Sequence, residues 1–411
     1  MTADRLPRVV VVGAGPAGAV FAYLLATRGI QVTLLERQSD FAREFRGEGL
    51  APSALELLAQ LGIDDALAAV PQATPSALEF YSRRKLVFRM EIDDEQFGGL
   101  APRIVSQPAM LEAIVGEAQK SPNLTFMRGT TVRELLRDSE GSRIQGVRVH
   151  SPDGEQRLDA DLVVGSDGRA SVVRRSGGFQ VRAEELPMDV VWCKVPRPAF
   201  FGDDEPTRFC IGSGHLFISY VAYDGQLQLA WIILKGTYGE LRKQGIEHWV
   251  DEMANHAPPD FEDHLRAHTS ELASPFLLST QADCVEQWSL PGALVIGDAA
   301  HTMSPVGGQG INIALRDAVV AANCLVPVLR GGPDPAAIDA AAARVQALRG
   351  PEVSAIQRMQ SMPPRIMLPQ TWWAEALRRL PELLRFAPVR ALAGRAAQPF
   401  AFGVTRVELE V

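Results

Sequence analysis

Residues 8–37 read RVVVVGAGPAGAVFAYLLATRGIQVTLLER and decide how the first part of the chain folds. The apolar, β-branched run 8–12 is typical of a strand that is buried on both faces. Gly13, Gly15 and Gly18 follow it with G-x-G-x-x-G spacing. The first glycine permits a tight turn, the second lets the backbone approach a pyrophosphate, and the third lets a helix pack against the strand. The segment therefore predicts a strand–turn–helix unit that binds a dinucleotide.

A carboxylate ends the second predicted strand of this unit. The helical pattern stops at Gly29, and a second apolar run, 31–35, is followed by Glu36. An acid at this place accepts hydrogen bonds from a ribose 2′-hydroxyl and repels a 2′-phosphate. The unit therefore favours FAD or NAD over NADP. A glycine-rich turn without a nucleotide is disfavoured, because strand, helix, second strand and acid are all present.

Composition limits the class of protein. A chain of 411 residues that are 46% hydrophobic can bury a large core, and its length predicts two domains. The net charge of −8 argues against a nucleic-acid partner. The four cysteines form no CxxC pair and no metal-ligand spacing, so we expect no metal site and a reducing, cytoplasmic location. No stretch approaches the roughly 20 apolar residues of a membrane span.

Along the chain, an α/β pattern alternates with a β-rich one. Helices are predicted over 52–61 and 108–119, and a hairpin over 77–92. Strands near 143–149 and 156–165 are joined by a turn. The runs between 187 and 235 predict a large antiparallel sheet, and the last 70 or so residues are expected to be helical.

This pattern predicts an α/β nucleotide-binding domain into which a β-sheet domain is inserted. The predicted boundaries are 1–76, 100–180 and 275–330 for the nucleotide domain, 77–99 and 181–274 for the sheet domain, and 331–411 for a helical C-terminal region.

A second segment with a strand and a glycine turn reads DLVVGSDG, residues 161–168. Gly168 frees the backbone after Asp167, and Ser171 and Arg174 follow closely. Hydroxyl and guanidinium groups in such a cluster can donate to phosphates. An ordinary turn at a strand end, with solvated arginines, explains the segment equally well.

A third segment carries more information. A predicted strand over 293–296 ends in Gly297 and Asp298, and an Asp at the carboxyl end of a parallel strand lies in the ligand crevice. Residues 305–312, PVGGQGIN, then lead into a helix. Small residues there let backbone N–H groups face a flat ring, and a helix N-terminus stabilises the negative charge of a reduced flavin. A loop with only a packing role is the alternative.

Together, GAGPAG with Glu36, SDG with Ser171 and Arg174, and GDAAH with PVGGQGIN resemble the three fingerprints of class A flavoprotein monooxygenases. That family includes the para-hydroxybenzoate and ubiquinone-pathway hydroxylases. The resemblance extends to about residue 330 and implies a Rossmann-like FAD domain of the glutathione-reductase type. The cofactor-binding residues that it implies are Gly13, Gly15, Ala17, Gly18, Glu36, Arg37, Arg46, Gln107, Asp167, Asp298, Gly310, Ile311 and Asn312.

The resemblance also assigns places on the cofactor. Glu36 would hold the ADP half of FAD, and Arg46 and Gln107 would lie along the pyrophosphate and the ribityl chain. Many relatives carry Arg where this chain has Gln107. Asp167 would serve both FAD and NAD(P)H, and Asp298 the ribityl–pyrophosphate region. Residues 305–312 would line the isoalloxazine, with Pro305, Gly307 and Gly308 nearest the chemistry.

The implied reaction uses NADPH or NADH to reduce the flavin, then O2. A flavin C4a-hydroperoxide would hydroxylate or epoxidise an electron-rich, aromatic or polyketide-like molecule. Only one G-x-G-x-x-G is present, so the nicotinamide would bind transiently, without a Rossmann domain of its own. The resemblance leaves the choice of nicotinamide open, and the protein is expected to be a monomer or homodimer.

The substrate would lie between the flavin and the inserted sheet. Candidate lining residues are Trp192, Phe209, Phe217, Tyr220, Tyr223 and Trp231. Aromatic residues in a sheet are often ordinary core, and this alternative stays open for each of them. Tyr220 and Tyr223 are preferred as polar contacts, with Tyr220 the candidate catalytic side chain. His215 is expected in an exposed turn, and no acid–base pair is assigned.

Three alternatives stay open. A halogenase or a prenyl reductase would keep the fold and change the chemistry, although no WxW motif occurs. A non-catalytic flavin-binding protein would keep the fingerprints without the reaction.

The tail from Pro363 to Arg406 has seven arginines and two glutamates, with Trp372 and Trp373. It is expected to cover the FAD domain, and contact with an anionic membrane surface is the disfavoured alternative.

Overall fold

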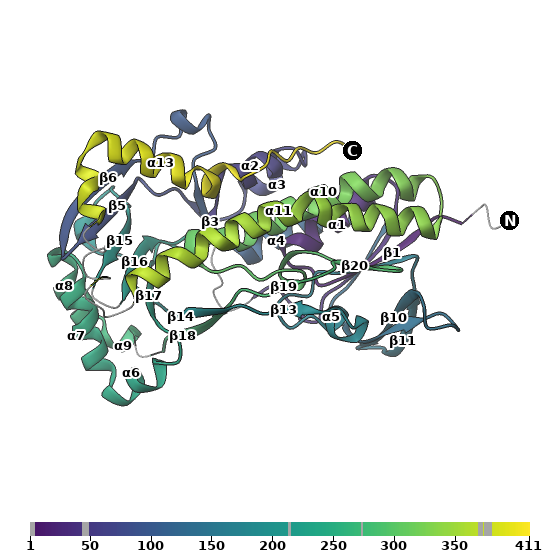
Figure 1. The fold of residues 1–411 in the computed structure, drawn as a ribbon, viewed down its shortest axis with the longest axis horizontal. Coiled ribbons are helices and arrows are strands. Elements are labelled where there is room, and N and C mark those ends of the chain that lie inside the picture. Colours follow the sequence, from purple (N-terminus) through teal and green to yellow (C-terminus); the bar gives the residue numbers. More distant parts are fainter. Residues whose placement is uncertain (1–4, 43–48, 213–214, 273, 369–372, 374–379) are drawn as a thin grey trace.

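Two large sheets lie at opposite ends of the protein, and long helices run between them in the computed structural model (Figure 1). The structure describes residues 5–42, 49–212, 215–272, 274–368, 373 and 380–411. The protein thus has a mixed α/β fold, as the sequence predicts.

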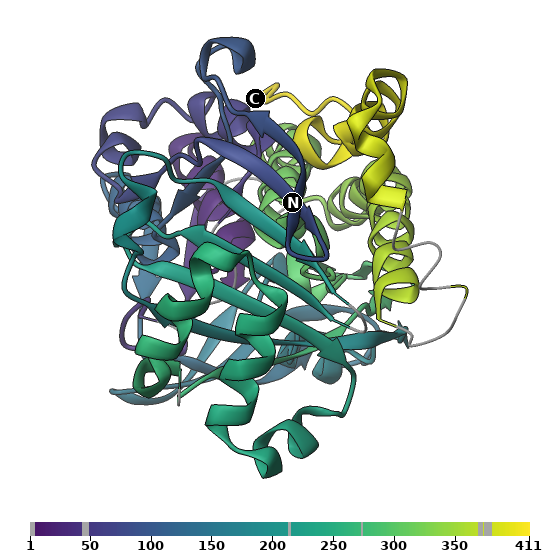
Figure 2. The ribbon, with the colours of Figure 1, turned by 90° about the vertical axis from the view of Figure 1, so that its left-hand side faces the viewer.

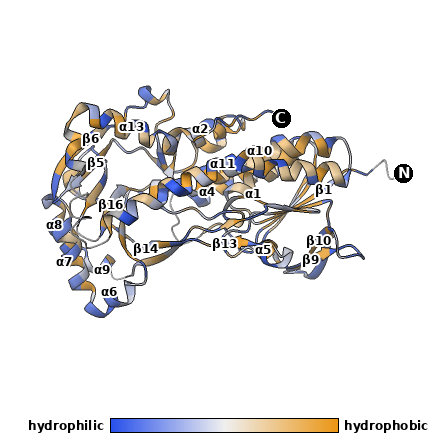
Figure 3. Ribbon diagram, in the orientation of Figure 1, coloured by the Kyte–Doolittle hydropathy of each residue, from blue (hydrophilic) through white to orange (hydrophobic). Residues whose placement is uncertain are grey.

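The first sheet contains the strand that opens the chain. Its order is β20-β21-β12-β1-β2-β8, and every neighbouring pair is parallel except β20 and β21. The strands are β1 (Arg8–Val12), β2 (Gln31–Leu35), β8 (Leu124–Met127), β12 (Leu162–Gly165), β20 (Ser289–Leu290) and β21 (Ala293–Val295). The four valines of β1 are buried, which explains their continuous apolar run. These strands appear in hydrophobic colours in Figure 3.

Helices cover the first sheet. Helix α1 (Pro16–Thr27) contacts α4 (Gln107–Ala118) and α10 (Gln309–Arg330), and α10 contacts α11 (Pro335–Met367). Within the described residues, Val306–Arg330 is one helical stretch long and apolar enough to cross a membrane. The expectation that no stretch is long and apolar enough for a membrane span is therefore wrong. However, 72% of that window is buried inside the protein, as in the core helix of a globular fold.

A small antiparallel sheet, β9 (Thr131–Arg137), β10 (Ile144–Ser151) and β11 (Gly154–Asp159), precedes β12. The single strand predicted over 156–165 is therefore two strands in different sheets. The chain changes sheets at Ala160, whose N–H binds Gln145 O, and at Asp161, whose N–H binds Arg8 O.

The second large sheet has seven strands in the order β18-β14-β17-β16-β15-β5-β6. They are β5 (Ala77–Ser82), β6 (Lys85–Glu91), β14 (Glu185–Val195), β15 (Thr207–Ile211), β16 (Leu216–Val221), β17 (Leu227–Leu234) and β18 (Phe276–Gln281). The predicted hairpin is β5–β6. The runs between 187 and 235 form antiparallel neighbours, as predicted. The sheet domain as a whole is not antiparallel, because β15 runs parallel to β5 of the predicted hairpin. No hairpin joins these two strands, so their relative direction is not constrained locally.

The two faces of this sheet have different neighbours. The outer face packs on α6 (Tyr238–Gln244), α7 (Ile246–His256), α8 (Pro259–Ala267) and α9 (Thr269–Leu272). Figure 2 shows these helices in front of the sheet. The inner face turns toward the loop that begins α10, because Val306 packs against its apolar residues.

Short elements complete the fold. Strands β3 (Gly49–Leu50), β7 (Arg103–Val105) and β4 (Gln72–Ala73) form a three-stranded sheet beside α2 (Pro52–Ala59) and α3 (Asp64–Ala68). Strands β13 (Val181–Arg182) and β19 (Cys284–Val285) pair with each other. Single 3-10 turns are η1 (Glu95–Phe97) and η2 (Ala199–Phe201). The chain ends with η5 (Leu380–Arg385), α13 (Ala387–Phe402) and an extended segment, 403–411.

Five charged or titratable side chains form a buried ionic cluster at the centre of the first sheet's helical layer. They are His301, Arg316, Asp317, Arg349 and Glu352, each at most 2% exposed. Asp317 accepts from Arg349 Nε at 2.8 Å and lies 2.7 Å from His301 Nε2. Glu352 pairs with Arg316 and Arg349.

Electrostatics keep the two acids of the buried ionic cluster charged. Burial would raise the pKa of Asp317, but the charges and hydrogen bonds of His301 and Arg349 lower it to about 2. The pKa of Glu352 is likewise lowered, because Arg349 and Arg316 outweigh its burial. The cluster joins α10 to α11 through paired charges that are buried from the surface.

Glu352→Gln should lower the free energy of unfolding by about 3–5 kcal/mol, because it leaves two buried guanidiniums facing one carboxylate. Urea denaturation at neutral pH measures this. Glu184→Gln is the matched control, since the Glu184–Arg365 pair is exposed and should contribute less than about 1 kcal/mol. Equal losses in the two variants would contradict a structural role for the cluster.

Candidate functional site

The glycine-rich turn after β1 is closely packed on one side and open on the other. Gly13 has φ +97°, and a Cβ there would lie 2.7 Å from Ser166 O. A Cβ on Gly18 would lie 2.0 Å from Gly13 O. A Cβ on Gly15 would meet nothing within 4 Å. Two glycines are therefore required by packing, while Gly15 borders open space at the start of α1.

Glu36 lies directly after β2, beside this turn. Its carboxylate accepts from Ala14 N at 3.0 Å and from Gln38 N at 3.0 Å, and the residue is 4% exposed. The geometry thus places the acid against the glycine turn, as predicted for a ribose contact. Arg37 is exposed, and Arg46 lies outside the described residues.

Asp167 lies at the carboxyl end of β12, with its backbone next to Gly13. Its carboxylate accepts from Ser171 Oγ at 2.5 Å and from Val172 N at 2.6 Å, so it caps α5 (Val172–Gly177). Burial raises the pKa of the Asp167 carboxyl, although these hydrogen bonds act to lower it.

The interpretation of Ser171 and Arg174 as phosphate donors is wrong. Ser171 is fully buried, and it bonds to Asp167 and to Arg174 N. Arg174 is 9% exposed and donates to Arg169 O at 2.6 Å. Both side chains stabilise the turn from within.

Asp298 follows β21 in the turn η3 (Gly297–Ala299). Its carboxyl is one-third exposed and lies 3.5 Å from Arg169 Nε. Gly297 anchors the turn, because its N–H donates to Asp317 Oδ2 at 3.0 Å. A Cβ on Gly297 would also lie 3.1 Å from the Ala17 side chain. The turn is thus held between the buried ionic cluster and the glycine-rich loop.

Sequence reasoning missed Arg169 as a site residue. It directly follows Gly168 of the second fingerprint, and this position was the available signal.

The segment 305–312 forms an open, glycine-rich entrance to α10. Gly307 and Gly308, within η4 (Val306–Gly308), have φ of +73° and +62° and are exposed, while Pro305 is half-buried. Cβ atoms on Gly308 and Gly310 would meet nothing within 4 Å. Ile311 is buried at the base of the helix. A flat group can therefore approach the first N–H groups of α10.

Asn312 fixes this entrance to its surroundings. Its Oδ1 accepts from Ala51 N at 2.8 Å, and its Nδ2 donates to Gly308 O at 2.8 Å and to Gly49 O at 3.3 Å. Strand β3 is therefore held to the loop, and β7 pairs with β3. Gln107 begins α4 two residues after β7, one residue earlier than the predicted start of that helix.

These features fit FAD. Open space borders Gly15, Gly308 and Gly310, where Cβ atoms would have room that a ligand can fill. One carboxylate stands at the end of β2, a second stands at the end of β21, and the N-terminus of α10 faces the same region. A model of the FAD binding domain family matches residues 7–349.

The chain belongs to the class A FAD-dependent monooxygenases. It is 33% identical over 364 residues to "6-methylpretetramide 4-monooxygenase" of Streptomyces rimosus, covering 88% of this chain and 84% of that protein. It is 28% identical to "3-amino-4-hydroxybenzoate 2-monooxygenase" of Streptomyces cremeus, covering 86% of each.

A solved structure shares the fold. PqsL of Pseudomonas aeruginosa, crystallised with 2-aminobenzoylacetate, has a TM-score of 0.76 and 20% identity, and covers 90% of this chain and 99% of its own. The relatives are monooxygenases of aromatic and polyketide molecules, and they give no support to the halogenase alternative.

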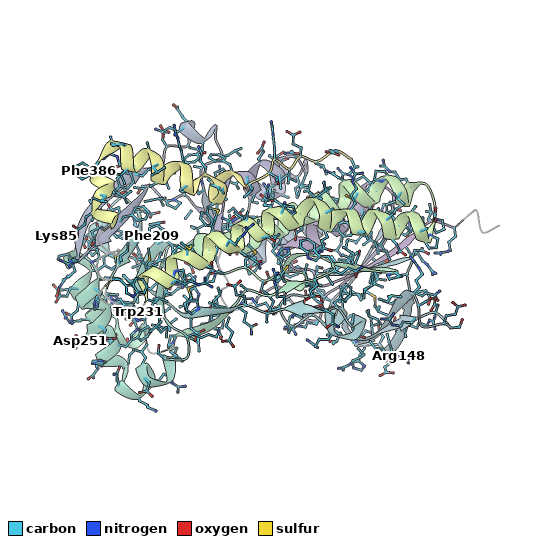
Figure 4. All side chains as sticks on the ribbon, in the orientation of Figure 1. Lys85, Arg148, Phe209, Trp231, Asp251 and Phe386 are labelled. Atoms are coloured by element: carbon cyan, nitrogen blue, oxygen red, sulfur yellow. The ribbon has the colours of Figure 1, made fainter. Side chains whose placement is uncertain are left out.

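In this monooxygenase, the predicted substrate-lining aromatics divide between the two faces of the seven-stranded sheet. Trp192 packs with the inner-face cluster, Phe209 pairs with Ile218 of that cluster, and Tyr220 meets Trp192 edge to face at 6.5 Å. Phe217 and Trp231 are buried on the outer face, so their prediction as lining residues is wrong. In Figure 4, Trp231 lies toward Asp251 of α7, and Phe209 lies on the other side, toward Phe386.

His215 and Tyr223 are the remaining candidate residues near this sheet. His215 is 9% exposed and stacks on Trp231 at 4.4 Å, so its expected exposure to solvent is wrong. Its ring also meets that of His256 edge to face at 3.8 Å, so the imidazole is part of the outer core. Tyr223 lies in the turn after β16, where Lys194 Nζ is 5.2 Å from its ring.

Gln228 is a polar side chain of the inner face that sequence reasoning missed. It is 1% exposed, pairs across the sheet with Tyr220, and donates to Cys193 O at 2.9 Å. Its Oε1 has no hydrogen-bond partner among the residues that the structure describes. A glutamine within the apolar run QLQLAWIIL was the available signal.

Gly15→Val should leave folding intact and abolish FAD binding, because its Cβ enters open space and its φ of −70° suits any residue. FAD content after gel filtration and the thermal midpoint of the apoprotein measure the two effects. Gly18→Ala is the contrasting variant, since its Cβ collides with Gly13 O, and we expect it to lose folded protein. Retained FAD in Gly15→Val would refute this placing of the pyrophosphate.

Proposed function

We propose that this monooxygenase hydroxylates a planar, fused-ring aromatic molecule of polyketide type, with NADPH or NADH as reductant and O2 as oxidant. The observation that carries the proposal is a row of apolar side chains across the inner face of the sheet. One residue from each of the seven strands contributes: Phe88, Phe80, Phe209, Ile218, Ala230, Trp192 and Phe276.

The row suits an extended flat ligand. Side chains directly opposite each other in neighbouring strands share a face, and seven strands span about 29 Å. Phe80 stacks on Phe209 at 5.0 Å and on Phe88 at 6.2 Å. Ala230, the smallest side chain, lies between Trp192 and Ile218. Most of the row is only half-buried, so apolar surface is left for a ligand to cover.

Polar groups beside the row can orient a phenol. Tyr220 and Gln228 are neighbours in the next register position, and the Gln228 amide oxygen is free to accept a hydrogen bond. A buried acceptor without a partner costs free energy unless a ligand satisfies it. We assign Tyr220 and Gln228 to a substrate hydroxyl.

We further propose how the chain holds its cofactor. The glycine turn with Ala17 and Glu36 would bind the ADP half, Arg37, Arg46 and Gln107 would lie along the chain between ADP and flavin, and Asp167 and Asp298 would flank it. These contacts presume a Rossmann-like domain of the glutathione-reductase type with the sheet domain inserted. A cytoplasmic monomer or homodimer completes the proposal.

FAD, when bound, supplies hydride acceptance and reaction with O2. The residues of the chain would stabilise charge on the flavin, hold the substrate and exclude water. The N-terminus of α10, with Pro305, Gly307 and Gly308, would stabilise negative charge on the ring. The inner face of the sheet would exclude water and hold the substrate, since Val306 brings the loop into contact with that face.

The first test is an anaerobic titration of the FAD-loaded protein with NADPH and then NADH, followed by flavin absorbance. We expect one of the two to bleach the flavin, faster when 6-methylpretetramide is added as a probe of the fused-ring class. Admitting oxygen should then give a product that is one oxygen atom heavier, measured by mass spectrometry. No bleaching with either reductant would overturn the proposed reaction; bleaching without oxygen insertion would overturn the substrate class.

Phe209→Leu should raise KM for the same probe by about two- to tenfold, because it removes a flat ring from the row while keeping an apolar side chain. FAD content should not change. Phe200→Leu is the control, since Phe200 is exposed and packs on Phe261 of the outer face. Steady-state kinetics of both variants measure the difference, and an unchanged KM in Phe209→Leu would exclude the row from substrate binding.

A further inference from the structure

We propose that helix α13 and the C-terminal segment 403–411 form a wall of the flavin site, in which Phe400 and Gln309 position the loop 305–308. The proposal rests on the placing of the flavin at this loop under the proposed function. It concerns residues beyond the three fingerprints, and it gives the C-terminus a part in shielding the reaction.

Two contacts join α13 to the loop. The Phe400 ring lies against one side of Gly307, so that a Cβ on Gly307 would lie 2.7 Å from it. The Gln309 amide donates to Gly307 O at 2.8 Å and to Phe400 O at 2.9 Å. Gln309 is 4% exposed, so its two hydrogen bonds to backbone carbonyls are largely shielded from solvent. The loop and the last turn of α13 are therefore held as one unit.

The segment after α13 is anchored in the first sheet's layer. At Gly403, with φ +80°, a Cβ would lie 2.6 Å from the Arg316 guanidinium, so the chain must approach the buried ionic cluster closely. Glu352 accepts from Val404 N at 2.8 Å, and Arg316 donates to Thr405 O. The same cluster holds Gly297 N–H through Asp317. The cluster thus links the turn that carries Asp298 to the segment 403–411.

Residues 409–411 are also fixed by hydrogen bonds. Leu409 N donates to Gln60 Oε1 at 2.7 Å, and Glu410 N donates to Asn323 Oδ1 at 2.9 Å. Arg28 donates twice to Val411 O, at 2.9 and 2.6 Å. The side chains of Leu409 and Val411 pack against the main core. Bonds to the residues that directly follow α1 and α2, and to Asn323 of α10, therefore fix a segment that has no regular secondary structure.

The other end of α13 rests on the second sheet. The turn η5 contacts β5 and β6, and the Arg390 guanidinium lies 5.8 Å from the Phe88 ring. Figure 1 shows α13 running from there to α2, where Phe402 stacks on Phe97 at 6.3 Å. No residue of α13 is fully buried. A helix that runs from the second sheet to α2 with no fully buried residue acts as a cover rather than as core.

The test compares Phe400→Ala with Phe400→Leu and Leu392→Ala. Leu392 is 69% exposed on the same helix and serves as the matched control. Two measurements are made on each FAD-loaded protein: hydrogen exchange of the peptide that contains residues 303–312, and quenching of flavin fluorescence by iodide. Phe400→Ala should speed exchange and raise the iodide quenching constant about twofold or more, because solvent then reaches the loop and the ring.

Phe400→Leu should restore most of the parent behaviour, and Leu392→Ala should match the parent. Gln309→Met keeps the side-chain volume, and it should speed exchange of the same peptide even if Phe400→Ala does not fold. Unchanged exchange in both Phe400→Ala and Gln309→Met overturns the positioning role. Faster exchange with unchanged iodide quenching overturns the wall. A parent protein that binds no FAD would instead contradict the proposed function. Hydrogen exchange can be measured on the same variants without FAD, and it would then still test the positioning role of Phe400 and Gln309.

Discussion

One buried carboxylate, that of Asp317, holds together the parts of the protein that would meet the flavin. It accepts from Gly297 N–H at the end of β21, from Arg349 of α11, and contacts His301. A carboxylate with no solvent access is stable only when such partners offset its desolvation. The Asp317 carboxylate therefore links the turn that carries Asp298 to α10 and α11. Glu352 extends this arrangement to the C-terminus.

The local motifs could be read from the sequence because their causes are local. Gly13 and Gly18 are required by contacts within a short strand–turn–helix unit, and the burial of β1 explains four successive valines. Asp298 follows β21 as expected, and Gly307 and Gly308 directly precede α10. These features depend on backbone sterics and on the position of strand ends, which a sequence displays directly.

Features that depend on long-range packing could not be predicted from the sequence. In β16, the alternation of Phe217 and Ile218 shows that their side chains point to opposite faces, but both faces of the sheet are covered by apolar groups. No contrast between polar and apolar residues then distinguishes the inner face from the outer one, and for this reason Phe217 and Trp231 could be taken for lining residues although they belong to the outer core. Arg316 and Glu352 are 36 residues apart, and only the packing of α10 on α11 brings their charges together.

The same long-range packing gives the C-terminus its place in the site. The proposed substrate face of the seven-stranded sheet and the proposed flavin loop 305–308 need a boundary against water where the two approach, since charge developing on a flavin is better stabilised by fixed dipoles than by solvent. Helix α13 contributes that boundary through the Phe400 ring, which lies against Gly307. The Gln309 side chain binds the backbone carbonyl of Phe400 and so joins the helix to the loop. A helix with an exposed outer side can serve here because the buried ionic cluster, and not the helix itself, supplies its anchorage. The shielding of the reaction is thereby coupled to the same charges that fix the turn of Asp298.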